Sequence, residues 1–309
     1  MTDAGDTGEK RLAIIAGLTM IGIYAIQFVA ARFSLREHLT ATDLAALRFG
    51  GAGVVFLPIV WRSGFAPMRA LGWRRALALA ALAGLPYPLI INWGLTYAPA
   101  AHAAALCPAS IVFFSFLLSR VFFNDGASQR RTIGVVAIIA GLLLFIAATR
   151  GDTSGAIIGD VLFIGSGLMF STYAVLVRLW RADPVTVTAA VVLLSCLPLP
   201  VLYFLAPSHI HAAAATEIVS QIVIQGILAG AEAMFLYTYI VRQLGPQTAS
   251  LFLPGIPIAT VIVGMAVLGE TPMTIQFAAI AIMAAGMAFS AIGGRNPSAS
   301  LNAPVSGGS

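Results

Sequence analysis

Charged side chains are scarce in this sequence. Only 9% of its 309 residues are Asp, Glu, Lys or Arg, whereas 59% are hydrophobic, and its mean hydropathy is +0.94. A water-soluble fold of this length could not bury so much apolar surface, which excludes an ordinary globular domain. The composition therefore predicts an integral membrane protein whose main partner is the lipid bilayer.

Cysteines and catalytic motifs are also nearly absent. Cys107 and Cys196 both fall in apolar stretches and have no neighbour at metal-binding or redox spacing, so we interpret them as packing residues. The motifs HExxH and GxSxG are missing, and no cluster of histidines and carboxylates lies deep in the apolar stretches. No clustered basic face is present for nucleic acid. We expect no enzyme activity, no metal, no cofactor and no nucleic-acid partner, and keep an intramembrane enzyme only as an alternative.

Long apolar runs are what the sequence has in abundance. A helix of about 20 residues crosses a hydrocarbon core about 30 Å thick, so each run can span the membrane once. A barrel is excluded, because runs such as Val135–Ala148 show no alternation of polar and apolar residues. The fold class predicted is all-α with ten transmembrane helices: Leu12–Arg32, Asp43–Trp61, Ala76–Tyr97, Ala101–Phe123, Thr132–Ala148, Ala156–Trp180, Pro184–Leu205, Ile218–Val241, Pro246–Leu268 and Thr274–Ile292.

The basic residues predict the orientation of these spans. With the N-terminus in the cytoplasm, only Arg32, Arg36 and Arg150 fall in outer loops, and the other basic residues outside the spans all lie on the inner side. This distribution follows the positive-inside rule. An even number of spans also places both termini in the cytoplasm. The tails 1–10 and 294–309 are rich in small and polar residues and are predicted to be disordered.

The sequence contains a weak internal repeat. A shift of 146 residues places Arg32 on Arg178, Pro108 on Pro254 and Asn124 on Glu270. Two repeats of five helices follow, over 11–148 and 155–293. Because five is odd, the second repeat enters the membrane from the opposite side, and the repeats are inverted. Inverted repeats are typical of transporters that bind substrate between their halves.

Prolines are the other recurring feature of the spans. They are expected to interrupt spans three, four, seven and nine, where they free carbonyl groups and kink helices. The residues are Pro86, Pro88, Pro108, Pro198, Pro200, Pro254 and Pro257.

Six segments of the two halves follow one another in a specific order and spacing. They are LAALRF (Leu44–Phe49), LTYAPAAHAAALCP (Leu95–Pro108), TIGVVAIIAGLLL (Thr132–Leu144), GDVLFIGSGLMFSTYAVLVR (Gly159–Arg178), QLGPQTASLFLPGIP (Gln243–Pro257) and VLGE (Val267–Glu270). Together with the ten-span layout, they resemble the EamA branch of the drug/metabolite transporter superfamily, and the resemblance covers about Leu12 to Ile292. The sequence departs from the family at FFND (Phe122–Asp125), where members often have a Leu-Gly-Glu turn.

What the resemblance implies is a basket-like bundle with a central cavity in a bacterial inner membrane. Members usually export amino acids, related metabolites or amphiphilic drugs, and the exporters of aromatic amino acids are the most useful comparison. We therefore expect a secondary transporter that exports a small-molecule substrate by alternating access, with protons as a second candidate ligand. The sequence leaves the oligomeric state open. A carrier of nucleotide sugars or sugar phosphates, and a channel or scaffold, are the alternatives.

Two charged residues stand out within the spans, where a charge at the bilayer centre costs about 2.5 to 3.5 kcal/mol on insertion scales. Glu232 lies near the middle of span eight and has no partner at i±3 or i±4 on its own helix, so it is a candidate for proton coupling. A protonated glutamate bonded to a neighbouring helix is the alternative. Arg48 in span two could hold a substrate carboxylate, snorkel outward, or pair with Asp43 or Asp160.

Other polar residues in the spans complete the predicted substrate site. If they converge, they form an apolar pocket with a few directional polar groups, as small-molecule sites usually do. Taken singly, each could equally be a contact between helices. The residues predicted to bind substrate are Tyr24, Gln27, Arg48, Asn92, His102, Tyr173, Glu232 and Tyr237.

Overall fold

The structure is a computed structural model, and in the residues that it describes the regular secondary structure consists of helices joined by turns and loops. These residues are 3–63, 66–123, 128–149, 155–232, 236, 239–240 and 252–292. Only the backbone is described for 3–10, 56–63, 67, 149, 184–185, 203, 231–232 and 292. The predicted tail 294–309 lies outside the described residues, and the first helix already begins at Asp3, within the predicted tail 1–10.

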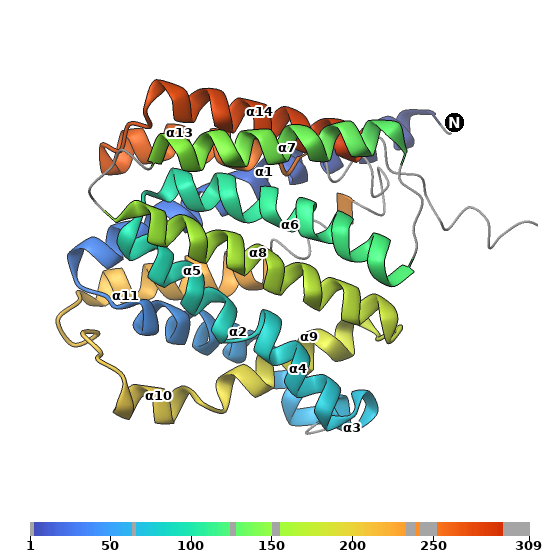
Figure 1. The fold of residues 1–309 in the computed structure, drawn as a ribbon. Coiled ribbons are helices and arrows are strands. Elements are labelled where there is room, and N and C mark those ends of the chain that lie inside the picture. Colours follow the sequence, from blue (N-terminus) through green and yellow to red (C-terminus); the bar gives the residue numbers. More distant parts are fainter. Residues whose placement is uncertain are drawn as a thin grey trace, which may run out of the picture.

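The described helices follow the chain in two groups (Figure 1). The first group is α1 (Asp3–Glu37), α2 (Ala41–Ser63), α3 (Ala66–Leu71), α4 (Trp73–Ala83), α5 (Pro86–Tyr97), α6 (Ala100–Phe123) and α7 (Gln129–Thr149). The second is α8 (Ala156–Leu179), α9 (Pro184–Cys196), α10 (Leu199–Leu205), α11 (Ala215–Gln221), the π-helix η1 (Ile222–Glu232), α13 (Gly255–Leu268) and α14 (Thr274–Ile292).

Within the described residues, six helical stretches are long and apolar enough to cross a membrane. They are Arg11–Glu37, Trp73–Tyr97, Ala100–Phe123, Gln129–Ala148, Ala156–Leu179 and Thr274–Ala291. Three shorter apolar stretches, Thr186–Leu202, Ala215–Gly230 and Gly255–Leu268, fall where spans seven, eight and nine are predicted. A multi-pass membrane fold is thus confirmed, while the total of ten spans stays a prediction.

Prolines interrupt some of these spans and not others. Span three is divided into α4 and α5 just before Pro86, and span seven into α9 and α10 at Pro198, as predicted. Pro254 lies just before the start of α13. Pro108, in contrast, lies inside the continuous helix α6, so the predicted interruption of span four is wrong. A membrane helix can keep its course through proline when its neighbours satisfy the freed carbonyl group.

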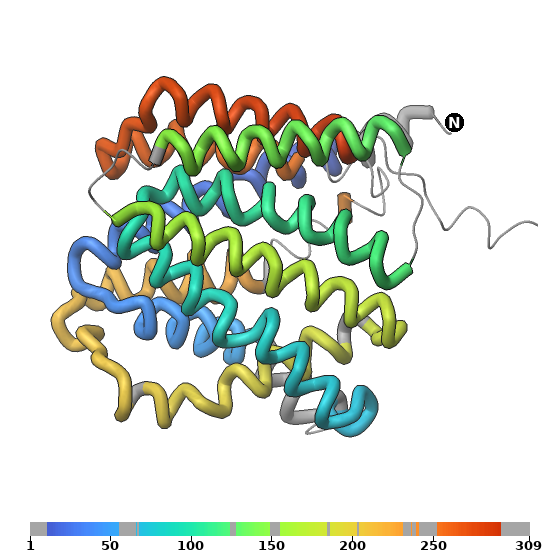
Figure 2. Tube along the Cα trace, viewed as in Figure 1, coloured from blue at the N-terminus to red at the C-terminus, as the bar shows by residue number. Residues whose placement is uncertain are grey.

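Helices at equivalent positions in the two groups pack against equivalent helices of the other group. α1 packs against α13 as α8 packs against α6, and α2 packs against η1 as α9 packs against α4. α7 and α14 pack against each other, so the last helices of both groups form one pair. Figure 2 shows the red end of the chain, α14, beside green α7, and the blue start of the chain beside orange α13. Such an exchange is what two five-helix units related by a twofold axis produce.

The first half of α6 is the centre of the bundle. Its residues from Ala100 to Ala109 include six alanines, and the described side chains of this stretch are almost all buried. Small side chains let helices approach closely in a membrane, where packing replaces the hydrophobic effect as the main attraction. α6 therefore contacts α1, α5, α7, α8, α13 and α14.

The bundle has a distal end and a proximal end. The distal end is the one where α1 ends at Glu37 and where α6, α8 and α14 begin. The proximal end is the one at which the N-terminus lies, on the right in Figure 1.

Candidate functional site

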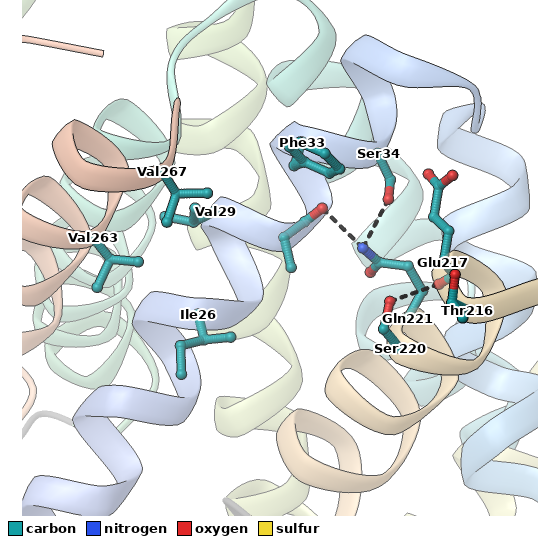
Figure 3. Close-up of a pocket in the computed structure, with 11 residues that line it drawn as sticks. Ile26, Val29, Phe33, Ser34, Thr216, Glu217, Ser220, Gln221, Val263 and Val267 are labelled. Atoms are coloured by element: carbon teal, nitrogen blue, oxygen red, sulfur yellow. Dashed lines mark hydrogen bonds between the residues drawn. The ribbon is translucent and has the colours of Figure 1, made fainter. Parts of the chain in front are cut away.

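A cavity of about 540 Å³ lies in the distal half of the bundle (Figure 3). It is lined by one face of α1, by α11 and by α13, so its walls come from both groups of helices. Apolar side chains line one part of it, and the hydroxyl, carboxyl and amide groups of α1 and α11 line the other. The lining residues are Ile26, Val29, Ala30, Phe33, Ser34, Thr216, Glu217, Ser220, Gln221, Val263 and Val267.

Two glutamines one helical turn apart join the wall of this cavity to α1. Gln221 Nε2 donates to the carbonyl of Ala30 at 2.8 Å and to Ser34 Oγ at 3.0 Å. Gln225 Nε2 donates to the carbonyl of Gln27 at 3.2 Å. A carbonyl only accepts, so these bonds fix the orientation of both amides. Gln221 Oε1 is left buried without a partner among the described residues.

Arg48 approaches the second of these glutamines. Its guanidinium lies 3.5 Å from Gln225 Oε1, and Tyr24 and Tyr87 are the titratable groups that interact with it electrostatically. Tyr24 comes from α1 and Tyr87 from α5, so three helices and η1 meet around this cation. An arginine held in this way can bind a carboxylate or an aromatic face.

An aromatic row leads away from this cation. The ring centroids of Tyr87 and Phe170 are 5.4 Å apart, and those of Phe170 and Tyr173 are 5.5 Å apart. Both contacts are tilted, a geometry that aromatic pairs favour over a face-to-face sandwich. The row connects α5 with α8 and places apolar, polarizable rings between these two helices.

The predicted partners of Arg48 are bound elsewhere. Asp43 accepts hydrogen bonds from Ser208 Oγ at 2.6 Å and from the backbone N–H of Thr40 at 2.9 Å. Asp160 lies beside His102, at 2.7 Å from its Nδ1. The suggestion that Arg48 pairs with either carboxylate is therefore wrong, because Asp43 and Asp160 bind other donors and Arg48 faces Gln225.

His102 belongs to a second polar cluster, which is buried at the distal end. The imidazole bonds to Asp160 on α8 through Nδ1 and lies 3.3 Å from Gln276 Nε2 on α14 through Nε2. His102, Asp160 and Gln276 are 3%, 0% and 4% exposed. The ring of Phe145 on α7 packs edge-on against the imidazole at 4.6 Å. Four helices thus meet at one histidine.

Glu270, which follows α13, forms a third cluster at the same end. Its carboxylate accepts from Arg32 Nε at 3.1 Å, from Arg36, and from the backbone N–H of Ala100 at 3.0 Å. Arg32 also donates to the carbonyl of Leu95. The carboxylate therefore caps the first turn of α6 and ties the ends of α1, α5, α6 and α13 together.

The residue related to Arg32 by the 146-residue shift behaves differently at the proximal end. Arg178 on α8 lies over the ring of Phe123 on α6, 3.9 Å from its centroid, which is a cation–π contact. Asn124, the counterpart of Glu270, lies outside the described residues. Related arginines thus join related helix pairs, with a carboxylate at one end and an aromatic ring at the other.

No metal centre accompanies these clusters in the part of the chain that the structure describes. Among those residues, no group of three His, Cys, Asp or Glu side chains could hold a metal ion. Cys107 and Cys196 are free thiols, on α6 and α9.

Comparison with known proteins gives the family. The profile of the EamA-like transporter family matches this chain twice, at residues 11–147 and 157–292. The chain belongs to the EamA-like transporter family. The two matches show that its membrane fold is built from two EamA repeats. They also assign α1 to the first repeat and α11 and α13 to the second, so the cavity lies between the repeats.

Relatives of the EamA protein support the same assignment. It is 22% identical, over 267 residues, to an uncharacterized transporter of Archaeoglobus fulgidus (strain ATCC 49558 / DSM 4304 / JCM 9628 / NBRC 100126 / VC-16), with 85% of this chain and 92% of the relative covered. One solved crystal structure is similar with a TM-score of 0.60 and 19% identity, over 91% of this chain and 97% of that one. This second likeness concerns the fold alone.

The structure brings only part of the predicted substrate site together. Tyr24, Gln27 and Arg48 lie around Gln225, as described above, and Tyr173 reaches them only through the aromatic row. Asn92 instead donates to the carbonyl of Ala41 at 3.4 Å and joins α5 to α2. His102 belongs to the separate cluster with Asp160. The side chain of Glu232 and the whole of Tyr237 lie outside the described residues.

Several residues of the EamA site were missed by the sequence reasoning. The glutamines of span eight carry a signal that could have been used, because Gln221 and Gln225 are four residues apart in an otherwise apolar helix and so share one face. Glu217 precedes them by the same spacing. No comparable sequence pattern marks Gln276, because its role depends on how closely α14 packs against His102 on α6.

Proposed function

We propose that this EamA protein is a secondary transporter that exports small organic metabolites by alternating access, with its distal end facing outside. The observation that carries the proposal is the cavity between α1 of the first repeat and α11 and α13 of the second. Transporters built from repeats bind substrate at such an interface and expose it to either side in turn. The positive-inside distribution supports both cytoplasmic termini and a bacterial inner membrane.

The polarity of the cavity supports an amino acid or an amphiphilic compound as substrate. Its lining contains one carboxylate, Glu217, and no lysine or arginine, while Ile26, Phe33 and Val263 supply apolar surface. A nucleotide sugar or sugar phosphate would require several cations around its phosphates. Arg48 supplies a single one, so that carrier type is the less favoured alternative. A channel or scaffold does not require a cavity between two repeats, so these alternatives are also less favoured.

A transport screen tests the proposal. Proteoliposomes containing the purified protein are loaded in turn with L-phenylalanine, L-threonine, ethidium and uridine diphosphate glucose, and efflux is compared with that of empty liposomes. We expect efflux of the aromatic amino acid or of ethidium and none of the nucleotide sugar. Selective efflux of the nucleotide sugar would replace the proposed substrate class, and no efflux of any compound would contradict the proposal.

Glu232 is proposed as a proton-coupling group. Glu232→Gln removes the ionisable oxygen but keeps the size and hydrogen-bonding capacity of the side chain, so the helix should fold normally. We expect the variant to exchange L-phenylalanine across liposomes as the wild type does but to lose the acceleration that a pH gradient gives. Glu37→Gln, at an exposed site on α1, is the control. An unchanged response to the gradient would remove Glu232 from the mechanism.

A further inference from the structure

The buried cluster at His102 has properties that a contact between helices does not require. An imidazole and a carboxylate are enclosed between α6 and α8 with almost no exposure, although both can ionise. Asp160 Oδ2 has no hydrogen-bond partner among the described residues. A buried carboxylate without its full set of donors is costly in a membrane protein and commonly marks a functional group.

The hydrogen bonds determine which nitrogen of His102 carries the proton. Gln276 Oε1 accepts from the backbone N–H of Met273 at 2.9 Å, so the NH₂ group of the same amide faces His102 Nε2 at 3.3 Å. An NH₂ group only donates, so Nε2 must accept and carries no hydrogen. Nδ1 therefore carries the proton and donates it to Asp160. The imidazole is neutral in this state. With the Asp160 carboxylate ionised, the pair has a net charge of −1.

A second proton at Nε2 would change both the charge and the contacts of this cluster. The imidazole would become a cation beside the Asp160 carboxylate, and the net charge of the pair would rise from −1 to 0, which reduces the cost of burying it. The new Nε2–H would then face the NH₂ group of Gln276, so that two donors would oppose each other. Gln276 could satisfy Nε2–H only by turning its oxygen away from Met273.

That exchange would act on α14. Gln276 is the third residue of this helix, and its bond to the N–H of Met273 caps the first turn. Turning the amide would leave that N–H without its partner. We propose that the His102–Asp160 pair is a proton-binding site whose protonation at His102 Nε2 turns the Gln276 amide, removes its cap from the Met273 N–H and so loosens the start of α14. The role of this protonation in coupling rests on the proposed transport function.

Among the residues that the structure describes, the other charged groups near the pair are already paired with one another. Arg32 on α1 and Glu270 after α13 form the third cluster, two residues away from His102 at Ala100. α7 contributes Phe145, and its arginines, Arg130 and Arg131, lie at the opposite end of that helix. α14 contains no titratable residue, and α5 contains only Tyr87 and Tyr97. Asp160 is therefore the group that controls the charge of His102.

Nuclear magnetic resonance of the full chain in lipid nanodiscs tests proton binding without a substrate. The chain has 4 histidines, so the signals of ring-¹⁵N His102 are assigned by their loss in His102→Gln. We expect Nδ1 alone to be protonated at the alkaline end of a pH series and Nε2 to gain a proton at the acidic end, with a simultaneous change at the Met273 amide. A proton on Nε2 at high pH, or no second protonation, would overturn the inference.

Two matched variants separate proton binding from packing. Asp160→Asn keeps an acceptor for Nδ1–H but removes the negative charge, so its imidazole should remain singly protonated over the same range. Ser171→Ala removes a 3.0 Å bond between α8 and the carbonyl of Ile111 on α6, a contact that does not titrate. It should titrate as the wild type does. An Asp160→Asn protein that titrates like the wild type would also overturn the inference.

Proteoliposomes then connect the site to transport. With L-phenylalanine, Asp160→Asn should keep counterflow and lose accumulation driven by a pH gradient. Retained accumulation in this variant would refute the coupling role and leave the proposed transporter intact. If the wild type shows no counterflow with any compound of the screen, the proposed function fails, and the magnetic resonance result still decides whether the pair binds a proton.

Discussion

Replacing Glu270 with alanine is expected to destabilise the protein by about 3 to 5 kcal/mol, the usual cost of breaking a buried ion pair from one side. The carboxylate is 9% exposed and Arg32 is 12% exposed, so neither is well screened by water, whereas Arg36, at 41%, contributes much less. The substitution would leave Arg32 without its counter-ion and would uncap the first turn of α6. The midpoint of thermal unfolding in nanodiscs measures the effect.

A series of variants separates the parts of this cluster. Glu270→Gln keeps an oxygen for the N–H of Ala100 and removes the charge, so its loss of stability should be intermediate. Arg32→Ala with Glu270→Ala should lose less than the sum of the two single changes, because the double variant leaves no unpaired charge between this pair. Glu37→Ala, exposed at the same end of α1, is the control. Equal midpoints for Glu270→Ala and Glu37→Ala would contradict the role assigned to the cluster.

The membrane fold could be predicted from the sequence because its causes are local. Length and apolar composition define a spanning helix regardless of its neighbours, and the prolines at 86 and 198 mark where two of them break. Pro108 could not be interpreted in this way, because it lies inside the continuous helix α6. Whether a proline interrupts a membrane helix depends on what surrounds it, and α6 is enclosed by six other helices.

The site was harder to predict because it depends on helix rotation and approach. Sequence position gave the depth of His102, Asn92 and Arg48 in the membrane but not the direction in which each side chain points. His102 therefore joined Tyr24 and Arg48 in the prediction, although it faces Asp160 and Gln276 in the structure. Asn92 likewise proved to join two helices.

The contacts of Arg48 illustrate the same limit. Asp43 lies five residues earlier on the same helix, and its similar depth in the membrane made it a possible partner. In the structure, Ser208 Oγ donates to Asp43, and Arg48 lies beside Gln225 of the second repeat. Contacts between repeats cannot be read from one helix alone, and they are the contacts from which this site is built.

A disulfide between the two repeats is expected to stop transport. Ala52 on α2 belongs to the first repeat and Gly230 on η1 to the second, and a Cβ atom built on Gly230 lies 3.9 Å from the Cβ of Ala52. Disulfides join Cβ atoms about 3.5 to 4.5 Å apart, so Ala52→Cys with Gly230→Cys should oxidise with little distortion. Cys107 and Cys196 are replaced by alanine, because Cys196 Sγ lies close to Gly53.

The bond should act on motion and leave the fold intact. Alternating access requires the repeats to move relative to each other around the cavity, and a covalent link across their interface holds them in one arrangement. The oxidised protein should keep its helical content and its elution volume. Each single cysteine variant, treated with the same oxidant, is the control for damage by the reagent.

Efflux of the screened compounds from liposomes that contain the oxidised double-cysteine protein tests the central claim most directly. Alternating access between the repeats predicts that efflux falls to the level of empty liposomes on oxidation and returns when a reductant opens the disulfide. Unchanged efflux from protein whose cross-link is verified by mass spectrometry would show that the repeats need not move, and would contradict the mechanism.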